Sequence, residues 1–322
     1  MSQSSEIMAV KPVTWDTFVR AETDKYSKSY VDIGGFGKFF HVRLPTPIDQ
    51  QNIIRMNRDT LYSMGVFDLT NPVTIIKPDT ANRFQSMQVI NQDQYTRKVL
   101  YDPGEYTFTQ ENIGTRYVIV VIRTLVDATK PEDIKAVNEI QDKTQAQQSS
   151  TGTYEVPNWD QESQDRLRDA INVLAATMTD SSRCFGDVNE VDPVAFLLGS
   201  AFGFGGNPAK DATYLNVVPD KNDGKTAYTL TVKEVPVDAF WSISLYNKDG
   251  YYEKNDREVY VINDRNATKN EDGSITIHFG GDTDQPNNMP IMEGWNYIVR
   301  LYRPRKEILD GTWTFPAPQL VD

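Results

Sequence analysis

The chain has 322 residues, of which 39% are hydrophobic and 24% are charged, and its formal net charge is −12. This composition is typical of a folded globular protein and excludes a disordered or fibrous chain, and the length favours two domains. Because the negative charge repels phosphate groups and anionic lipid headgroups, we expect neither nucleic acid nor a membrane among its partners.

An amphipathic helix is predicted near the N-terminus, from a cap at Thr14 to about Tyr30. Between these residues, Phe18, Val19 and Tyr26 recur near the 3.6-residue period of a helix face. The glycines that follow at 34, 35 and 37 mark its end. We therefore expect residues 1–34 to form an N-terminal helical segment.

Residues 35–128 are predicted to form a first β domain. The pattern there changes to short β-branched and aromatic runs separated by turn residues. These runs are Val73–Ile76, Phe84–Ile90, Tyr95–Tyr101 and Tyr117–Val126. The last of them contains five consecutive apolar residues and is typical of a buried central strand.

Residues 129–204 are predicted to form a helical connecting segment. Thr129 can cap a first helix with Pro131 in its first turn, a second helix is expected from Asn158, and Asp192-Pro193 opens a third. Between the first two helices, the polar run Gln145–Thr153 has the composition of an interdomain connection.

Residues 205–322 are predicted to form a second β domain. The alternating run Tyr228–Val232 and the run Phe240–Tyr246 predict strands, and Trp295–Tyr302 is expected to close the sheet. Turn residues predict two hairpins, at Asn222-Asp223-Gly224 and Glu271-Asp272-Gly273.

Familiar catalytic and metal-binding motifs are absent from the sequence. Two histidines and one cysteine offer no zinc-type ligand set, so no metal site is predicted, although an all-oxygen magnesium or calcium site stays open; no particular cofactor is indicated. Cys184 is expected to be a buried, inert thiol. Because the first 15 residues hold no apolar run of signal-peptide length, and no apolar run of 18 residues follows, we expect a cytoplasmic protein.

The densest group of polar side chains is the heptad Asn57-Arg58-Asp59-Thr60-Leu61-Tyr62-Ser63. On a strand, Asn57 and Asp59 would share one face, and Arg58 and Tyr62 the other. Two interpretations stay open. The heptad could be a polar network that pins this segment to a sheet, because buried arginine and aspartate need partners, or it could be a ligand-binding site.

Two arginines stand out because apolar residues surround them. Arg123 lies inside the last β run of the first domain, where its charge must be paired with a carboxylate such as Asp59, reach solvent or bind an anionic ligand. Arg300 stands next to Leu301-Tyr302, and the same alternatives apply to it.

The motifs resemble a two-domain family of uncharacterised proteins. Its N-terminal half, domain of unknown function 1254, is indicated by the heptad, Arg83-Phe84-x-Ser86-x-Gln88, Arg123-Thr124-Leu125-Val126-Asp127 and Gln141-Asp142. Its usual partner, domain of unknown function 1214, is indicated by Trp241-Ser242-x-Ser244-Leu245-Tyr246, Asp272-Gly273-Ser274-Ile275-Thr276, Asn288-Met289-Pro290 and Arg300-Leu301-Tyr302-Arg303-Pro304. The resemblance implies a mainly β fold, in which a smaller immunoglobulin-like sandwich and a larger jelly-roll-like sandwich are joined by an α-helical segment. It implies no activity.

The leading hypothesis is a protein that binds a small molecule, with hydrolase or lyase activity as an option, at a pocket between the domains. In this hypothesis Arg58 and Arg123 hold an anionic or carbonyl group, Asp59 acts as acid or base, and Tyr62 donates a proton or hydrogen bond. The catalytic candidates are thus Arg58, Asp59 and Tyr62, and the ligand-binding candidates are Asn57, Arg123, Trp241, Tyr246 and Arg300.

Two other hypotheses belong to different functional classes. A non-catalytic structural or assembly protein could use edge strands of the two sandwiches to form a homo-oligomer. A carbohydrate-binding protein could use Trp241, Trp295 and Trp313, although aromatic residues of this kind more often fill β-sandwich cores.

Overall fold

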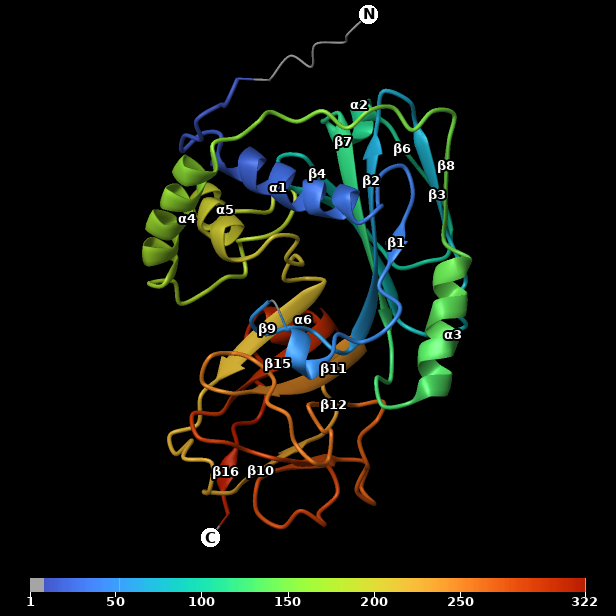
Figure 1. Cartoon of the computed structure of the whole chain (residues 1–322). Coiled ribbons are helices and arrows are strands. Elements are labelled where there is room, and N and C mark those ends of the chain that lie inside the picture. Colours follow the sequence, from blue (N-terminus) through green and yellow to red (C-terminus); the bar gives the residue numbers. More distant parts are fainter. Residues whose placement is uncertain (1–8, 52, 322) are drawn as a thin grey trace, which may run out of the picture. The chain divides into compact units, whose positions relative to one another are not determined.

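The computed structural model describes residues 9–51 and 53–321 (Figure 1). Contacts between residues group the chain into two compact units, each assembled from three separate stretches. The first unit comprises Met1–Val42, Tyr62–Arg123 and Glu139–Pro208, and the second comprises Arg43–Leu61, Thr124–Asn138 and Ala209–Asp322. The boundaries expected from the sequence divide the chain into consecutive segments instead, and they stay a prediction.

Two β-sheets form the frame of the first unit. The larger has the strand order β1-β2-β7-β4-β5 and the smaller the order β6-β3-β8. The strands are β1 (Phe40–His41), β2 (Thr60–Asp68), β3 (Val73–Lys77), β4 (Gln85–Asn91), β5 (Thr96–Leu100), β6 (Gly104–Phe108), β7 (Tyr117–Leu125) and β8 (Gln145–Gln148). The polar run expected to connect the domains begins with the strand β8. This strand forms although its side chains are polar, because its main chain pairs antiparallel with that of β3.

The central strand β7 distributes its side chains to both faces of the larger sheet. Val118, Val120 and Ile122 are fully buried in the core that also contains Val73 and Ile75 of the smaller sheet. The alternate residues Tyr117, Ile119 and Val121 belong to a second core that includes side chains from the end of the N-terminal helix. This alternation follows from the two-residue period of a strand, and it places Arg123 on the second face.

Three helices of the first unit pack around Phe18, Ala21, Ile171 and Ala201. They are α1 (Phe18–Asp32), α4 (Gln161–Ala175) and α5 (Pro193–Phe202), and a short α2 (Gln110–Ile113) precedes β7. Asp192 caps α5 as the sequence predicts, by accepting hydrogen bonds from the main-chain N–H groups of Val194 and Ala195. The second predicted helix begins three residues later than expected, because Asp160 and not Asn158 caps it.

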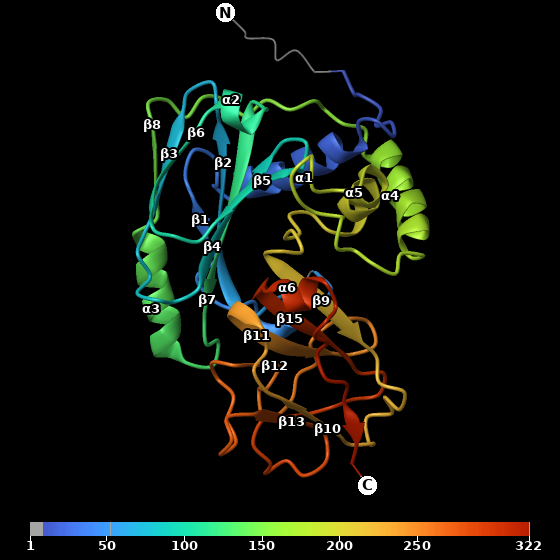
Figure 2. The ribbon, with the colours of Figure 1, turned by 180° about the vertical axis from the view of Figure 1, so that it is seen from behind.

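The second unit is a sandwich of two four-stranded sheets, ordered β14-β13-β10-β16 and β12-β11-β15-β9. Its strands are β9 (Ala212–Val217), β10 (Tyr228–Val232), β11 (Val237–Tyr246), β12 (Val261–Asn263), β13 (Ile275–Phe279), β14 (Asn288–Met289), β15 (Asn296–Pro304) and β16 (Gln319–Leu320). Two short helical elements of this unit are η1 (Ile48–Gln50) and α6 (Lys306–Leu309). The helix α3 (Pro131–Asp142) belongs partly to each unit. Figure 2 shows β10 and β13 opposite β11 and β15.

The connections in this sandwich differ from those predicted. The turns at Asn222–Gly224 and Glu271–Gly273 do not close hairpins, because each joins strands that belong to different sheets. The last long strand, β15, does not close its sheet but lies between β11 and β9. Local turn residues specify a reversal of the chain, whereas the partner of the next strand depends on tertiary packing.

The prediction of a mainly β fold with two sandwiches is confirmed. No helix in the described part of the chain is long and apolar enough to cross a lipid bilayer.

Candidate functional site

One sheet of the second unit has an apolar face and a polar face. On β11, Trp241, Ile243 and Leu245 point into the sandwich core. The residues between and after them, Ser242, Ser244 and Tyr246, therefore point to the opposite face. Since all of these side chains are buried, the polar face must be covered by other groups that satisfy its hydrogen bonds.

The segment that precedes β2 supplies part of this cover. Asp59 is 1% exposed, and its carboxylate accepts hydrogen bonds from Ser242 Oγ at 2.6 Å and from Asn263 Nδ2 at 3.2 Å. Asn57 Nδ2 donates to the hydroxyl of Tyr302 at 2.9 Å. Burial raises the pKa of Asp59, although the nearby charge of Arg300 and these hydrogen bonds act in the opposite direction.

Arg300 holds the same segment from the middle of the sheet. It is 3% exposed and donates to Ser244 Oγ at 2.6 Å, to Tyr246 Oη at 2.8 Å and to the main-chain oxygen of Arg55 at 2.8 Å. The Tyr246 hydroxyl in turn donates to the main-chain oxygen of Met56 at 2.8 Å. Asn57, Asp59, Tyr246 and Arg300 thus share one polar network, which pins residues 55–59 to the sheet.

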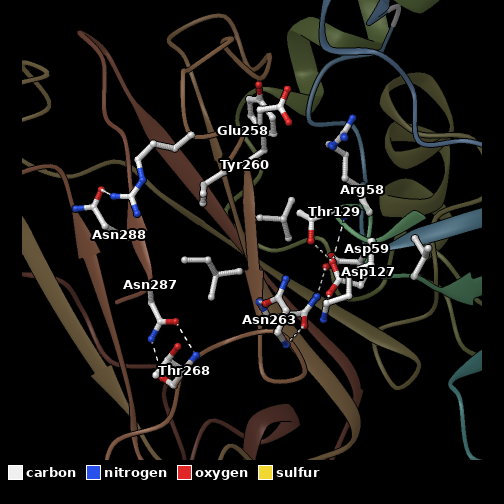
Figure 3. A pocket seen from close by; sticks show the side chains of 18 residues that line it. Arg58, Asp59, Asp127, Thr129, Glu258, Tyr260, Asn263, Thr268, Asn287 and Asn288 are labelled. Carbon is white, nitrogen blue, oxygen red and sulfur yellow. Dashed lines mark hydrogen bonds and ion pairs between the residues drawn. The ribbon is translucent and has the colours of Figure 1, made fainter. Parts of the chain in front are cut away.

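A cavity of about 350 Å³ lies beside this network, within the second unit (Figure 3). Arg58 and Asp59 line it together with residues 126–130, 257–263 and parts of two further loops. A neighbouring cavity of about 630 Å³ shares part of its lining with the first, including Arg58, Arg257, Glu258 and Tyr260. These side chains therefore stand on the wall between the two cavities.

Arg58 is held by main chain and aromatic rings. Its Nη1 donates to the main-chain oxygen of Thr46 at 2.5 Å, and its guanidinium carbon lies 5.5 Å from the ring centre of Tyr260 and 6.0 Å from that of Tyr252. Among the described residues, no carboxylate lies within ion-pair distance of it. Burial lowers the pKa of Arg58, and the two tyrosines and Glu258 partly offset this effect.

Most other polar groups of the cavity wall hold their own loops together. Asp127 accepts from Thr129 Oγ1 at 2.6 Å and from Lys130 Nζ at 2.8 Å; burial alone would raise its pKa, but these bonds lower it. Asn287 bonds both main-chain groups of Thr268. In the part of the chain that is described, the Glu258 carboxylate makes no hydrogen bond or ion pair. Its main chain has a left-handed φ of 53°.

The remaining candidates lie elsewhere. Arg123, in the first unit, is 7% exposed and donates to Gln88 Oε1 at 2.7 Å and to the main-chain oxygen of Gly205 at 3.0 Å. Its guanidinium lies 5.3 Å from the ring centre of Tyr62. The structure thus brings these two residues together in the first unit, whereas Asp59 is bound by Ser242 and Asn263 in the second.

Two expectations about individual side chains need correction or restatement. The prediction that Arg58 and Tyr62 share one face of a strand is wrong, because β2 begins only at Thr60 and Arg58 precedes it. Trp241 is buried in the sandwich core and does not line either cavity. Sequence reasoning missed Tyr252, Glu258 and Tyr260, which lie in an irregular segment about 200 residues after Arg58 and carry no motif.

No group of three or more histidine, cysteine, aspartate or glutamate side chains within residues 9–51 and 53–321 is placed to hold a metal ion. The cavity lining described above comes from one unit alone, so the predicted pocket between domains stays a prediction.

Comparison with known proteins identifies two family models. Residues 36–148 match the protein of unknown function DUF1254, and residues 211–306 match the protein of unknown function DUF1214. No curated protein matches the chain.

Two solved structures are similar to this chain. The VPA0106 protein from Vibrio parahaemolyticus is 19% identical, with a TM-score of 0.72 over 96% of this chain and 98% of that one. A putative uncharacterized protein from Burkholderia cenocepacia is 12% identical, with a TM-score of 0.53 over 95% of this chain and 88% of that one. At these identities the likeness concerns the fold alone.

Proposed function

Because this chain belongs to the two-domain family that joins DUF1254 to DUF1214, both of unknown function, we propose a function from its cavities: binding of a small molecule through an anionic group. The group is a carboxylate or another anion of similar size, and Arg58 binds it. The observation that carries this proposal is the state of Arg58, a half-buried guanidinium that lines two cavities without a carboxylate partner among the described residues.

A guanidinium has five N–H donors, and the hydrogen bond from Arg58 Nη1 to the main-chain oxygen of Thr46 uses only one of them. The rings of Tyr252 and Tyr260 restrict its orientation, so little conformational freedom is lost when a ligand binds. An arginine prepared in this way suits a planar carboxylate, which it can bind through two parallel hydrogen bonds. The volume of the cavities lies within the range of small-molecule sites, about 300–1,000 Å³.

The carbohydrate hypothesis receives less support from the same structure. Stacking against a sugar needs an accessible aromatic face, but Trp241 is 4% exposed and Trp295 is fully buried. Both rings fill the core of the second sandwich, and the third candidate, Trp313, is partly buried against that core.

Hydrolase or lyase chemistry in the same cavity is a second candidate, and Asp59 favours it. This residue lines the cavity, and burial raises the pKa of its carboxyl group, which is common for catalytic acids and bases. Asp59→Asn should then abolish turnover of a bound compound while the compound still binds. If turnover persists in this variant, Asp59 is a structural residue only. The catalytic role predicted for Tyr62 stays a prediction.

The binding proposal is tested by calorimetric titration of unbranched monocarboxylates into the wild-type protein and into Arg58→Met. We expect saturable binding that weakens at least about 10-fold in the variant, since a hydrogen bond to a charged group contributes about 1.5–3 kcal/mol. Arg166→Met is the matched control, because Arg166 is an exposed residue of α4 in the first unit. Equal affinity in wild type and Arg58→Met would refute the proposal.

A further inference from the structure

The wall between the two cavities carries a negative group, on Glu258, as well as two positive ones, on Arg58 and Arg257. Arg58 and Glu258 both line both cavities, and Figure 3 labels their side chains in the lining of the first. We infer that this wall selects a small zwitterion, whose carboxylate binds Arg58 and whose ammonium group binds Glu258. This inference rests on the proposed function and names the ligand class that would occupy the site.

Arg58 and Glu258 are neighbours, but their charged groups do not form an ion pair. Glu258 acts electrostatically on Arg58, yet no ion pair within 4.0 Å joins them in the described structure. Two opposite charges held apart on one wall present an anion-binding group and a cation-binding group at the same time. A ligand that carries both charges in complementary order satisfies both of them.

Glu258 is an exposed residue whose main chain is fixed by hydrogen bonds on both sides. The side chain of Asn255 accepts hydrogen bonds from the N–H groups of Arg257 and Val259, at 3.2 Å each, and donates to the main-chain oxygen of Val259 at 3.0 Å. Glu258 N–H donates to the main-chain oxygen of Asn255 at 3.1 Å. These bonds enclose Glu258 and sustain its left-handed φ of 53°, a conformation that glutamate rarely adopts.

The Tyr260 side chain on this wall supports the same ligand class. The Tyr260 ring lies against the Arg58 guanidinium, and its hydroxyl makes no hydrogen bond to any residue in the described ranges. A phenol hydroxyl can donate to a carboxylate or accept from an ammonium group. Arg257 already donates to the main-chain oxygen of Thr283 and, at 3.3 Å, to Asn288 Oδ1. Glu258 would repel a second negative group, so a phosphate ester or a dicarboxylate fits beside Arg58 less well than a zwitterion does.

The test compares pairs of probes that have equal length and differ at one end. Each ω-amino acid, from glycine to 5-aminopentanoate, is titrated beside the simple acid in which a methyl group replaces the ammonium group, from propanoate to hexanoate. The proteins are the wild type, Glu258→Gln, Arg58→Met and Glu271→Gln. Glu271 is an exposed residue of the same unit and provides the matched loss of one negative charge.

In wild type we expect at least one amino acid to bind about 10-fold more tightly than its matching acid, since an ammonium–carboxylate hydrogen bond is charge-assisted. Glu258→Gln should abolish this preference and leave the affinity for the simple acid equal or higher. Glu271→Gln should leave the preference unchanged.

Two results overturn the inference and leave the proposed function intact: no amino acid binds more tightly than its matching acid although the acids require Arg58, or the preference survives in Glu258→Gln. The proposed function itself fails when Arg58→Met binds the simple acids as well as wild type does. Folding of each variant is checked by its thermal unfolding, so that a lost affinity is scored only for a folded protein.

Discussion

Replacing Arg300 by methionine tests whether the polar network beneath the cavity stabilises the second unit. Methionine has a similar length and keeps most of the packing, but it removes every hydrogen bond that the guanidinium donates. The main-chain oxygen of Arg55 loses its 2.8 Å bond, and Ser244 loses a donor at 2.6 Å. The variant also removes a positive charge that acts on the buried carboxylate of Asp59.

The magnitude follows from burial. Arg300 is 3% exposed and Asp59 is 1% exposed, so solvent cannot replace the lost interactions. Removing one partner of a buried charged network costs about 3–5 kcal/mol in the free energy of unfolding. For a unit of this size, each kcal/mol lowers the midpoint of thermal unfolding by about 2–4 °C, so we expect a decrease of about 6–20 °C.

Differential scanning calorimetry is the appropriate assay, because a chain with two compact units can unfold in more than one transition. The decrease should affect only the transition of the second unit. Arg265→Met is the control, since the Arg265 side chain is 60% exposed and its loss should lower the midpoint by no more than about 2 °C.

A second substitution separates the charge effect from lost packing. If Asp59 is left uncompensated in Arg300→Met, then adding Asp59→Asn should recover part of the lost stability, because it removes the remaining buried charge. A decrease below about 2 °C in Arg300→Met, or a double variant whose loss is the full sum of the two single losses, would refute the reasoning.

Three further predictions concern the first unit. Cys184 is buried with a pKa of about 11, so at pH 8 a thiol reagent should modify it only after unfolding, and rapid labelling of the native protein would contradict this. Burial lowers the pKa of Lys77 from 10.5 to about 8, so between these pH values the unfolded chain binds more protons and the free energy of unfolding should rise with pH. In urea unfolding, Lys77→Met should lack this rise. If the free energy of unfolding depends on pH equally in wild type and in Lys77→Met, the lowered pKa of Lys77 is wrong. Gly152→Ala should lower the unfolding midpoint more than Gly114→Ala, because both glycines have positive φ but only the Cβ at 152 would clash with the Asp68 side chain. Equal losses would mean that backbone conformation alone matters.

Much of the local structure could be predicted because each pattern rests on nearby residues. The apolar run of β7 predicts a central strand, and Asp192-Pro193 predicts the start of α5, because a cap and a fixed φ act within one turn. The strand β8, by contrast, was not predicted, because its partner is distant in sequence. β8 is polar and owes its strand conformation to β3, which lies about 70 residues earlier.

The heptad also shows the difference between what nearby residues predict and what distant partners decide. Its composition predicted both a pinning network and a ligand site, and local sequence held no information to choose between them. In the structure, Asn57 and Asp59 take part in the network, whereas Arg58 turns to the cavities. The choice depends on Tyr302, Ser242, Tyr252 and Tyr260, none of which is near the heptad in the chain.

The sequence by itself determined the mainly β fold, because the 2.0-residue and 3.6-residue periods and the turn residues act over short distances. The two-domain family was indicated separately, by the resemblance of short motifs such as the heptad and Arg300-Leu301-Tyr302-Arg303-Pro304. Only the tertiary structure decided which polar residues are satisfied by partners and which face a cavity. That distinction depends on contacts across as many as 245 residues, as between Asn57 and Tyr302, and chain separation of this size leaves no local pattern.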